Sequence, residues 1–341
     1  MSEALITDRW VSQDDLRGKV EAWRFGKQGT RSLPLGQRTY SMGIMNVTPD
    51  SFSDGGEHYG LEKAMAHYER MKKDQVDVID LGGESTRPGS TYVSEEEEMR
   101  RIIPVIQAIR AKDPDIVLSV DTYKAPVAQA ALEAGADIIN DIYALFADPD
   151  MGEVVAKHGA GVILMNHPAY YRPNLKRSQV FGDRPWVHPF PANLVEKMEK
   201  MDILEAQCAF LNMAIQKCRS LGIPYDHICI DPGLGFGMTT VENLKLVRCL
   251  DHLVASGLPV LLAPSRKRFI KEILGQEAET VEIGTASIVA YGVKEGVDLV
   301  RIHDLDIQLP ALRMANFILH GDEMAQDLTQ IKQHGSTQII Q

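Results

Sequence analysis

The sequence predicts a (β/α)₈ barrel, the TIM-barrel fold, preceded by a short hairpin. Short apolar runs alternate eight times with longer amphipathic segments, and eight such units fit one barrel of roughly 250 residues or more. The apolar runs are continuous, which is typical of parallel strands that are buried on both faces. A doubly wound open sheet gives the same alternation. No G-x-G-x-x-G motif follows the first run, which disfavours its dinucleotide-binding form.

The elements divide the chain into an N-terminal extension (residues 1–35), a barrel (36–320) and a polar C-terminal tail (321–341). In the extension, residues 23–40 have the turn chemistry of a hairpin, with Gly29 and the segment 34–36 as turns. Strands are expected at 40–45, 76–81, 116–120, 138–139, 161–165, 228–230, 260–263 and 299–302. Helices are expected at 61–74, 95–112, 125–134, 151–158, 194–221, 241–256, 283–295 and 310–320.

Composition narrows the class of protein. The net charge of −11 argues against a general nucleic-acid binder, but a local cationic pocket can still hold an anionic substrate. No run of 18 apolar residues predicts a membrane span, and the first ten residues do not resemble a signal peptide. The four cysteines form no C-x-x-C pair, which predicts neither a zinc site nor a disulfide framework. We therefore expect a cytoplasmic globular protein.

A ring of polar residues follows the predicted strands. Asn46, Asp80, Asp121, Asn140–Asp141, Asn166, Asp231, Ser265–Lys267 and His303–Asp304 lie at, or directly after, the eight strand ends. In a (β/α)₈ barrel these positions converge on one mouth, where buried polar groups need partners. The alternative is that some of them cap helices or bridge strands, and Asp141 and Asp304 are the first candidates for that role.

The chemistry of the ring suggests two kinds of ligand group. The carboxylates Asp80, Asp121 and Asp231, with the amides Asn46 and Asn140, suit a flat heterocycle rich in N–H donors. The cationic set suits a phosphate or pyrophosphate and comprises Arg87, Arg266, Lys267, Arg301 and His303. Any single arginine of this set could instead be a solvated surface residue, so the argument depends on their clustering at strand ends.

Three loops are rich in glycine, proline and small hydroxyl residues. Residues 46–56 read NVTPDSFSDGG and residues 82–90 read GGESTRPGS, a composition that suits loops closing over a substrate. Residues 231–237 read DPGLGFG and lack the G-K-[ST] ending of a P-loop, so we expect them to let the backbone approach a flat ring. A long segment rich in proline, arginine and aromatic residues (167–193) interrupts the pattern and is expected to be functional or mobile.

These blocks together resemble the dihydropteroate synthase family. The resemblance is carried, in the family order and over residues 20 to 320, by MGIMNVTPDSFSDGG, DLGGESTRPGS, SVDTYKAPVAQAALEAGADIINDI, DPGLGFG, SRKRFI and RIHDL. The first two blocks are highly specific, whereas the others are also found in pterin-binding methyltransferase domains. The chain departs from the family pattern in a long loop after the fifth strand and around the Ser-Arg-Lys motif, where Ala263–Pro264 precede it and Arg268 follows it.

The resemblance implies a homodimeric (β/α)₈ enzyme, assisted by Mg²⁺. Its reaction would join dihydropterin diphosphate to 4-aminobenzoate by loss of pyrophosphate followed by amine attack. By motif, the pterin would contact Asp121, Asn140, Met165, Asp231, Phe236 and Lys267. Pyrophosphate would meet Asn46 (through the metal), Thr86, Arg87, Arg301 and His303, and the arylamine would lie near Phe52, Pro88 and Ser265. The residues implied in catalysis are Asp121, Lys267, Arg301 and His303.

Two alternatives stay open from sequence. A pterin-binding methyltransferase domain would share the Asp/Asn ring but would not need both specific loops. A non-catalytic pterin-binding paralogue would not need to keep Asn46, Arg301 and His303.

Overall fold

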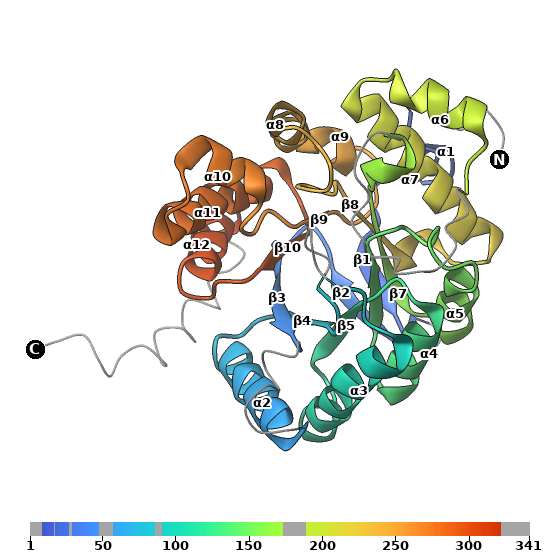
Figure 1. The fold of residues 1–341 in the computed structure, drawn as a ribbon. Helices are drawn as coiled ribbons and strands as arrows, with labels where there is room; N and C mark the ends of the chain where they lie inside the picture. The colour runs from blue at the N-terminus through green and yellow to red at the C-terminus, as the bar shows by residue number, and fades with distance from the viewer. Residues whose placement is uncertain are drawn as a thin grey trace, which may run out of the picture.

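The computed structural model describes residues 9–16, 18–26, 29–47, 57–85, 91–172 and 189–321. Its centre is an eight-stranded parallel sheet in the order β8-β7-β6-β5-β4-β3-β10-β9 (Figure 1). A parallel bridge between Ile230 and Val260 links the two outer strands of this order, so the sheet curves into a barrel. The predicted (β/α)₈ class is confirmed. Among the described residues, no helix has the length and apolar character needed to span a membrane.

All eight predicted strands are present, with ends that differ by at most two residues from those expected. They are β3 (Tyr40–Asn46), β4 (Val78–Gly82), β5 (Val117–Asp121), β6 (Ile138–Asp141), β7 (Gly161–Met165), β8 (Ile228–Asp231), β9 (Leu261–Leu262) and β10 (Leu299–Ile302). The polar residues that the sequence places after the apolar runs extend several strands by one or two positions, because a backbone ladder does not require an apolar side chain.

The helices surround the barrel (Figure 1). They are α2 (Glu57–Lys73), α3 (Glu95–Lys112), α4 (Ala125–Ala134), α5 (Met151–His158), α6 (Ala192–Glu199), α7 (Ile203–Ser220), α8 (Thr240–Arg248), α9 (Leu250–Val254), α10 (Arg268–Leu274), α11 (Ala278–Glu295) and α12 (Gln308–His320). The single helix expected at 194–221 is wrong. Helix α6 ends at Glu199, and Asp202 begins α7 as its N-cap, because the side chains of Asp202 and Glu205 form a capping box.

Two other helix expectations need correction. The helix expected at 241–256 is divided into α8 and α9 at Cys249. Helix α10, directly after the Ser-Arg-Lys motif, was not expected, and α11 begins five residues earlier than predicted. Short helices carry too few periodic positions to be recognised from hydrophobic spacing alone.

The inner face of the barrel changes from apolar to polar along each strand. Its amino-terminal layer packs into one cluster with the hairpin: Tyr40, Met42, Val78, Val117, Ile138, Ile163, Cys229, Leu261 and Leu299. Because side chains on one face of a strand recur every second residue, the same face carries Asp80, Asp121 and Arg301 further along. The carboxyl end of the barrel is therefore the polar end.

The predicted hairpin is confirmed and covers the amino-terminal end of the barrel. Strands β1 (Ala22–Phe25) and β2 (Arg31–Pro34) pair antiparallel. Trp23 and Phe25 are both 0% exposed and pack on the first layer of barrel side chains. The Trp23 Nε1–H donates to the His227 carbonyl at 3.1 Å. These contacts close the end of the barrel that lies opposite the polar ring.

The segment before the hairpin is held against the outer helices. It contains the short helix α1 (Ser12–Asp15). Trp10 is buried and donates from Nε1 to the His252 carbonyl at 2.7 Å. Asn212, buried in α7, accepts from the Val11 backbone N–H at 3.0 Å. The extension is thus packed onto the barrel's helices by long-range contacts.

Candidate functional site

One row of the barrel sheet brings three predicted site residues together. The strand register pairs Asn46 with Gly82, Gly82 with Asp121, and Asp121 with Asn140. A Cβ placed on Gly82 would lie 3.7 Å from Asn46 Oδ1 and 3.8 Å from Asp121 Cβ. Glycine at this position therefore leaves room between the amide and the carboxylate for a ligand group.

Arg301 joins two carboxylates inside the barrel. Its Nε donates to Asp80 Oδ2 at 2.6 Å, and Nη2 donates to Asp121 Oδ2 at 2.7 Å. Asn140 donates to the same Asp80 oxygen at 3.3 Å. The sequence predicts that Asp80 belongs to the polar ring but does not predict which residue it contacts. In the structure Asp80 accepts hydrogen bonds from both Arg301 and Asn140.

The electrostatics of this cluster are set by burial. Burial raises the pKa of Asp121 to about 7, although the nearby Arg301 guanidinium opposes the rise. Burial lowers the pKa of Arg301, but the charges of Asp80 and Asp121 outweigh it, and the net result is a raised pKa. Asp80 Oδ1 is buried and has no hydrogen-bond partner among the described residues. The cluster therefore has acceptor capacity that protein donors do not fill.

Asp231 lies on the neighbouring part of the wall, where its Cα pairs with Met165 in the sheet register. Its Oδ1 accepts from the Gly233 backbone N–H at 2.6 Å. Burial raises the pKa of Asp231 to about 6, while this hydrogen bond and the charges of Lys267 and Arg301 lower it. Like Asp121, Asp231 ionises close to neutral pH.

The 231–237 loop brings an aromatic ring and a lysine together. The Lys267 Nζ lies 4.4 Å from the centroid of the Phe236 ring, a cation–π distance. A Cβ placed on Gly235 would lie only 2.7 Å from Lys267 Cδ, so glycine allows the lysine to cross this loop. The approach of this loop to a flat ring stays a prediction.

His167 packs behind Phe236. Its ring stacks on Tyr143 with centroids 4.5 Å apart and lies 5.7 Å from Phe236. Burial lowers the pKa of His167 to about 3, so the ring is neutral near neutral pH. Tyr170 and Phe190, from the two ends of the 167–193 segment, are also buried in this aromatic group. Residues 173–188 of that segment lie outside the described residues.

His303 and Ser265 meet at the ends of β10 and β9. The Ser265 Oγ lies 3.1 Å from His303 Nδ1, and the His303 backbone N–H donates to the same oxygen at 3.3 Å. Ser265 is buried and His303 is half-buried. The side chain of Gln308, which begins α12, contacts both residues.

Two aspartates of the ring have structural roles, but within loops rather than as the expected helix caps or strand bridges. Asp141 accepts from the backbone N–H groups of Tyr143 and Leu145 at 2.8 and 2.9 Å. Asp304 accepts from those of Asp306 and Ile307 at 2.9 and 2.8 Å. These bonds shape the loops that follow β6 and β10.

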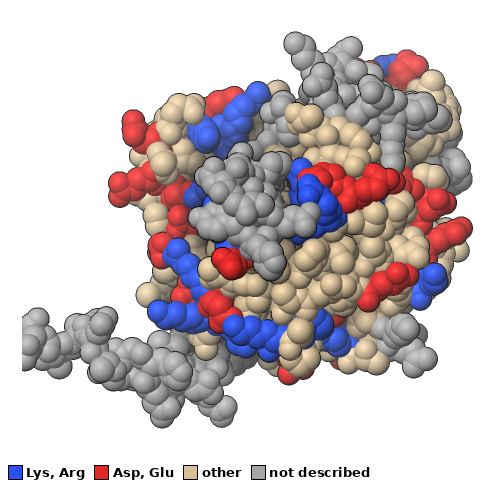
Figure 2. All heavy atoms as spheres, turned by 60° about the horizontal axis from the view of Figure 1, so that its bottom comes forward, with Lys and Arg blue, Asp and Glu red and all other residues tan. Residues whose placement is uncertain are grey.

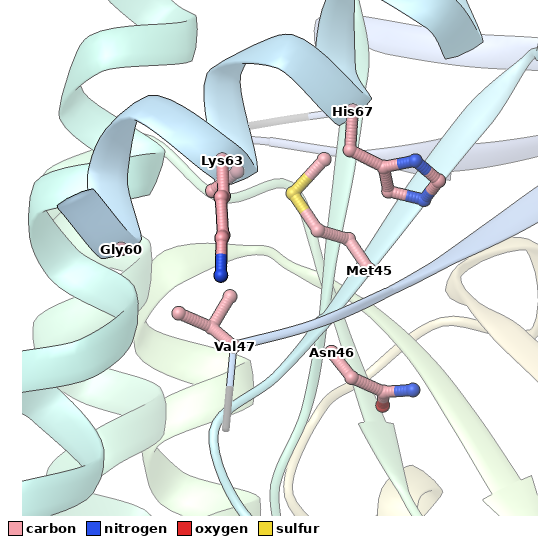
Figure 3. A pocket seen from close by; sticks show the side chains of 7 residues that line it. Met45, Asn46, Val47, Gly60, Lys63 and His67 are labelled. Atoms are coloured by element: carbon pink, nitrogen blue, oxygen red, sulfur yellow. The ribbon is translucent and has the colours of Figure 1, made fainter. Parts of the chain in front are cut away.

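The remaining predicted contacts are divided between described and undescribed residues. Asn46 is exposed at the end of β3, and Figure 3 shows its side chain on the opposite side of the strand from Lys63 and His67 of α2. The pocket in Figure 3 lies between the end of β3 and α2, and its lining includes Asn46 as well as Lys63 and His67. Phe52, Thr86, Arg87 and Pro88 lie outside the described residues.

A buried lysine next to the site was not identified from sequence. Lys124, in the SVDTYK block, is fully buried and donates to Glu98 at 2.6 Å and to the Val93 carbonyl at 2.6 Å. It also pairs with Glu84, whose pKa is raised by burial despite Lys124. Lys124 therefore joins the chain on both sides of residues 86–90. A lysine in a polar motif carries no sequence signal for such burial.

A closed barrel with carboxylates, amides and cations converging at its carboxyl end defines a TIM-barrel enzyme with a small-molecule site at that end. The chain belongs to the pterin-binding enzyme family, whose sequence profile matches residues 42–303. Its relatives within that family include dihydropteroate synthases. The enzyme of Bacillus subtilis (strain 168) is 42% identical over 274 residues, which cover 80% of this chain and 86% of the relative. The enzyme of Clostridium beijerinckii is 40% identical over 294 residues, which cover 86% of this chain and 99% of the relative.

Solved structures agree with this assignment. A Clostridium difficile dihydropteroate synthase crystallised in the presence of pteroic acid aligns with a TM-score of 0.72 and 39% identity, over 84% of this chain and 98% of that chain. A Xanthomonas albilineans dihydropteroate synthase with 4-aminobenzoic acid aligns with a TM-score of 0.70 and 38% identity, over 86% and 98%.

Proposed function

We propose that the protein is a dihydropteroate synthase, which condenses 6-hydroxymethyl-7,8-dihydropterin diphosphate with 4-aminobenzoate to give 7,8-dihydropteroate and pyrophosphate. The observation that carries the proposal is the buried group Asp80, Asp121, Asn140 and Arg301 at the carboxyl end of a barrel of this family. Relatives crystallised with pteroic acid and with 4-aminobenzoic acid support both halves of the substrate pair.

The pterin would lie against the carboxylates. Asp121 and Asp231 supply acceptors for ring N–H groups, and the Asn140 amide both donates and accepts. Phe236 and Met165 provide apolar surface, and Lys267, which lies over Phe236, would donate to a ring acceptor. The acceptor capacity of Asp80 Oδ1 supports a donor-rich ligand in this part of the barrel.

The diphosphate would lie at Arg301 and His303. Arg301 uses Nε and one Nη2 hydrogen for Asp80 and Asp121, and a guanidinium has five N–H donors. Donors therefore remain for phosphate oxygens without breaking either pair. By motif, Thr86 and Arg87 would add to this set.

The residues at the barrel mouth could hold Mg²⁺ if the substrate diphosphate supplies part of its coordination shell. Among the described residues no three His, Cys, Asp or Glu side chains form a metal cluster. Mg²⁺ commonly takes one or two protein oxygens and fills its shell with water and substrate phosphate. Asn46 supplies such an oxygen next to Gly82 at the barrel mouth. Held there with the diphosphate, the ion would neutralise charge on the leaving group.

In the reaction, the bond between the pterin methylene and the diphosphate oxygen breaks and the oxygen keeps the electron pair. Arg301 and His303 bind the negative charge that develops there. Asp121, when ionised, stabilises the positive charge on the pterin methylene. The arylamine nitrogen then forms the new C–N bond and loses a proton. We place the arylamine near Ser265, with Phe52 and Pro88 as further contacts by motif.

We also propose a homodimer that works in the cytoplasm. Exposed apolar side chains lie on α10, α11 and α12, which are grouped on one side of the barrel (Figure 1): Ile273, Leu274, Ile283, Met314, Ile318 and Leu319. A surface of this kind is typical of subunit contacts. All four cysteines are free thiols, which suits a reducing compartment.

The proposal is tested by coupled pyrophosphate release from the dihydropterin diphosphate with and without 4-aminobenzoate. We expect continued turnover only when the amine is present, and a strong loss in Asp121→Asn. Turnover that needs neither the amine nor Asp121 would overturn the proposal.

A further inference from the structure

A buried hydrogen-bond chain lies behind His303. It runs from the His303 ring through Ser265 and Gln308 to Glu282, which also pairs with Arg266. Gln308 is 0% exposed, Glu282 6% and Ser265 7%. Ser265 comes from the loop after β9, Gln308 from the start of α12 and Glu282 from the first turns of α11, so the chain joins three parts of the fold around one imidazole.

The direction of the chain is fixed at Gln308. Its Nε2 donates to the Glu282 carboxylate, which accepts only. Its Oε1 lies 3.2 Å from the His303 backbone nitrogen, which donates only. Both neighbours require the same orientation of the amide, so the Gln308 oxygen is the atom that faces Ser265.

The hydroxyl of Ser265 therefore has one available direction. Its oxygen lies 3.1 Å from Gln308 Oε1, so its single proton is donated to that acceptor. Towards His303 the Ser265 oxygen then only accepts, from the backbone N–H at 3.3 Å and from Nδ1 at 3.1 Å. A nitrogen that donates carries the proton, so Nδ1 of His303 is protonated.

We propose that Gln308, held by Glu282, is a positioning residue that sets the tautomer of His303, with the proton on Nδ1 and with Nε2 as the nitrogen that meets substrate. A neutral His303 would then present a lone pair at Nε2, and it would donate to a phosphate oxygen only as the imidazolium. The leaving group would be met by the charged ring. This consequence depends on the proposed function, whereas the tautomer itself does not.

The test is long-range ¹H–¹⁵N correlation NMR of the full-length protein labelled with ¹⁵N-histidine, which distinguishes the two tautomers. The signals of His303 are assigned by their loss in His303→Gln. We expect the Nδ1–H pattern in the wild type. In Gln308→Met the acceptor for Ser265 is lost, so its hydroxyl can donate to Nδ1 and the signals shift towards the Nε2–H pattern.

A charge-preserving exchange provides the rescue. In the double variant Glu282→Gln with Gln308→Glu, the new carboxylate still accepts from Ser265 and from the His303 backbone, and the new amide donates to it. We expect the Nδ1–H pattern to return. Glu279→Gln, an exposed change on the same helix, and Arg266→Ala, which removes the ion pair but leaves the Glu282 carboxylate, should both keep the wild-type tautomer.

An Nε2–H pattern in the wild type, or an unchanged tautomer in Gln308→Met, overturns the inference. Should Gln308→Met not fold, Ser265→Ala removes the acceptor of the Nδ1 proton itself and should also lose the Nδ1–H preference. Pyrophosphate release is measured on the same variants. Absence of synthase turnover in the wild type would count against the proposed function alone, because the NMR result is independent of substrate.

Discussion

At the scale of single residues, Asp121 combines two opposing influences. Arg301 stabilises its carboxylate through a 2.7 Å hydrogen bond, yet burial raises the pKa of Asp121 to about 7. An ionised Asp121 suits a cationic or donor-rich ligand, but without a ligand its buried charge destabilises the folded protein. The charge of Asp121 should therefore strengthen ligand binding and lower the stability of the ligand-free protein.

The cost predicts a pH-dependent effect of Asp121→Asn on stability. Below about pH 4 the side chain is protonated in both the folded and the unfolded chain, so the variant gains nothing from the loss of charge. As pH rises towards about 7, the unfolded aspartate ionises and the folded one resists. The free energy of unfolding of the variant should therefore rise relative to the wild type across this window, by on the order of a few kcal/mol, and level off above it.

Urea unfolding at a series of pH values measures this difference. Taking the difference between variant and wild type removes the contributions of other titrating groups. One such group is His167, whose pKa is lowered to about 3, so that it stabilises the fold as pH rises. A difference that stays constant from pH 4 to 8 would show that Asp121 is not strained by burial.

Lys267→Ala should weaken binding of the dihydropterin on the order of 10- to 100-fold, as expected for one lost hydrogen bond to a charged group. Isothermal titration calorimetry measures the affinity. Lys157→Ala, an exposed lysine on α5, serves as the control and should leave it unchanged. Equal affinities for the wild type and Lys267→Ala would show that the lysine is misassigned.

These residues differ in how far the sequence reveals them. Asp121, Asn140 and Asp231 follow apolar runs, so strand counting alone places them at the mouth. Gln308 and Glu282 were not identified, because each lies within an amphipathic helix and gains its role from a contact between helices. Asp80 lies at the end of β4 as predicted, but its pairing with Arg301 depends on the pairing of β10 with β3, strands that lie far apart in the sequence.

At the scale of elements, the loops that follow β7 and β8 are joined by hydrogen bonds and pack closely. The Asn166 backbone N–H donates to the Asp231 carbonyl at 2.9 Å, and the Asn166 side chain donates to the Pro232 carbonyl at 3.1 Å. Gly233 has a φ of +74°, and a Cβ there would lie 1.9 Å from the Asn166 carbonyl oxygen. The loop that holds Asp231 thus has room for glycine only.

Gly233→Ala should destabilise the protein by more than positive φ alone explains. Gly222→Ala is the matched control, because Gly222 has a φ of +81° but has nothing within 4 Å of a placed Cβ. We expect about 1 kcal/mol for the control and on the order of 3 kcal/mol or more for Gly233→Ala. Thermal melts of both variants measure the difference, and equal losses would contradict the steric explanation.

Element boundaries show what hydrophobic spacing can and cannot determine. The helices at 95–112, 125–134 and 151–158 were predicted with their observed bounds, because long periodic segments average out local exceptions, and the strands were predicted to within two residues. The break between α6 and α7 was missed, although Asp202 and Glu205 have the spacing of a capping box, because the surrounding apolar pattern continues across it.

At the scale of the whole molecule, charge and apolar surface are distributed differently. On the face in Figure 2, basic and acidic side chains lie interspersed, so the net charge of −11 is not gathered there in one patch. By contrast, exposed apolar side chains recur on α10, α11 and α12, and Ile318 and Met314 are 74% and 63% exposed. This contrast favours association through the C-terminal helices.

Ile318→Glu should shift the protein from dimer to monomer, because a carboxylate buried at a subunit contact loses its hydration. Sedimentation equilibrium measures the dissociation constant, which should rise at least tenfold. Val241→Glu, at a residue 76% exposed on α8, is the control and should leave the dimer intact. A wild-type protein that is monomeric at micromolar concentration would contradict the proposed homodimer.

The hairpin that closes the amino-terminal end of the barrel also determines what intrinsic fluorescence can report. The chain has three tryptophans: Trp10, Trp23 and Trp186. Trp23 lies in the closed end, and Trp10 is buried against the outer helices, so neither indole lies at the polar mouth. Their emission should report global unfolding. In Trp186→Phe, which keeps only these two indoles, emission should change on unfolding and not on substrate binding.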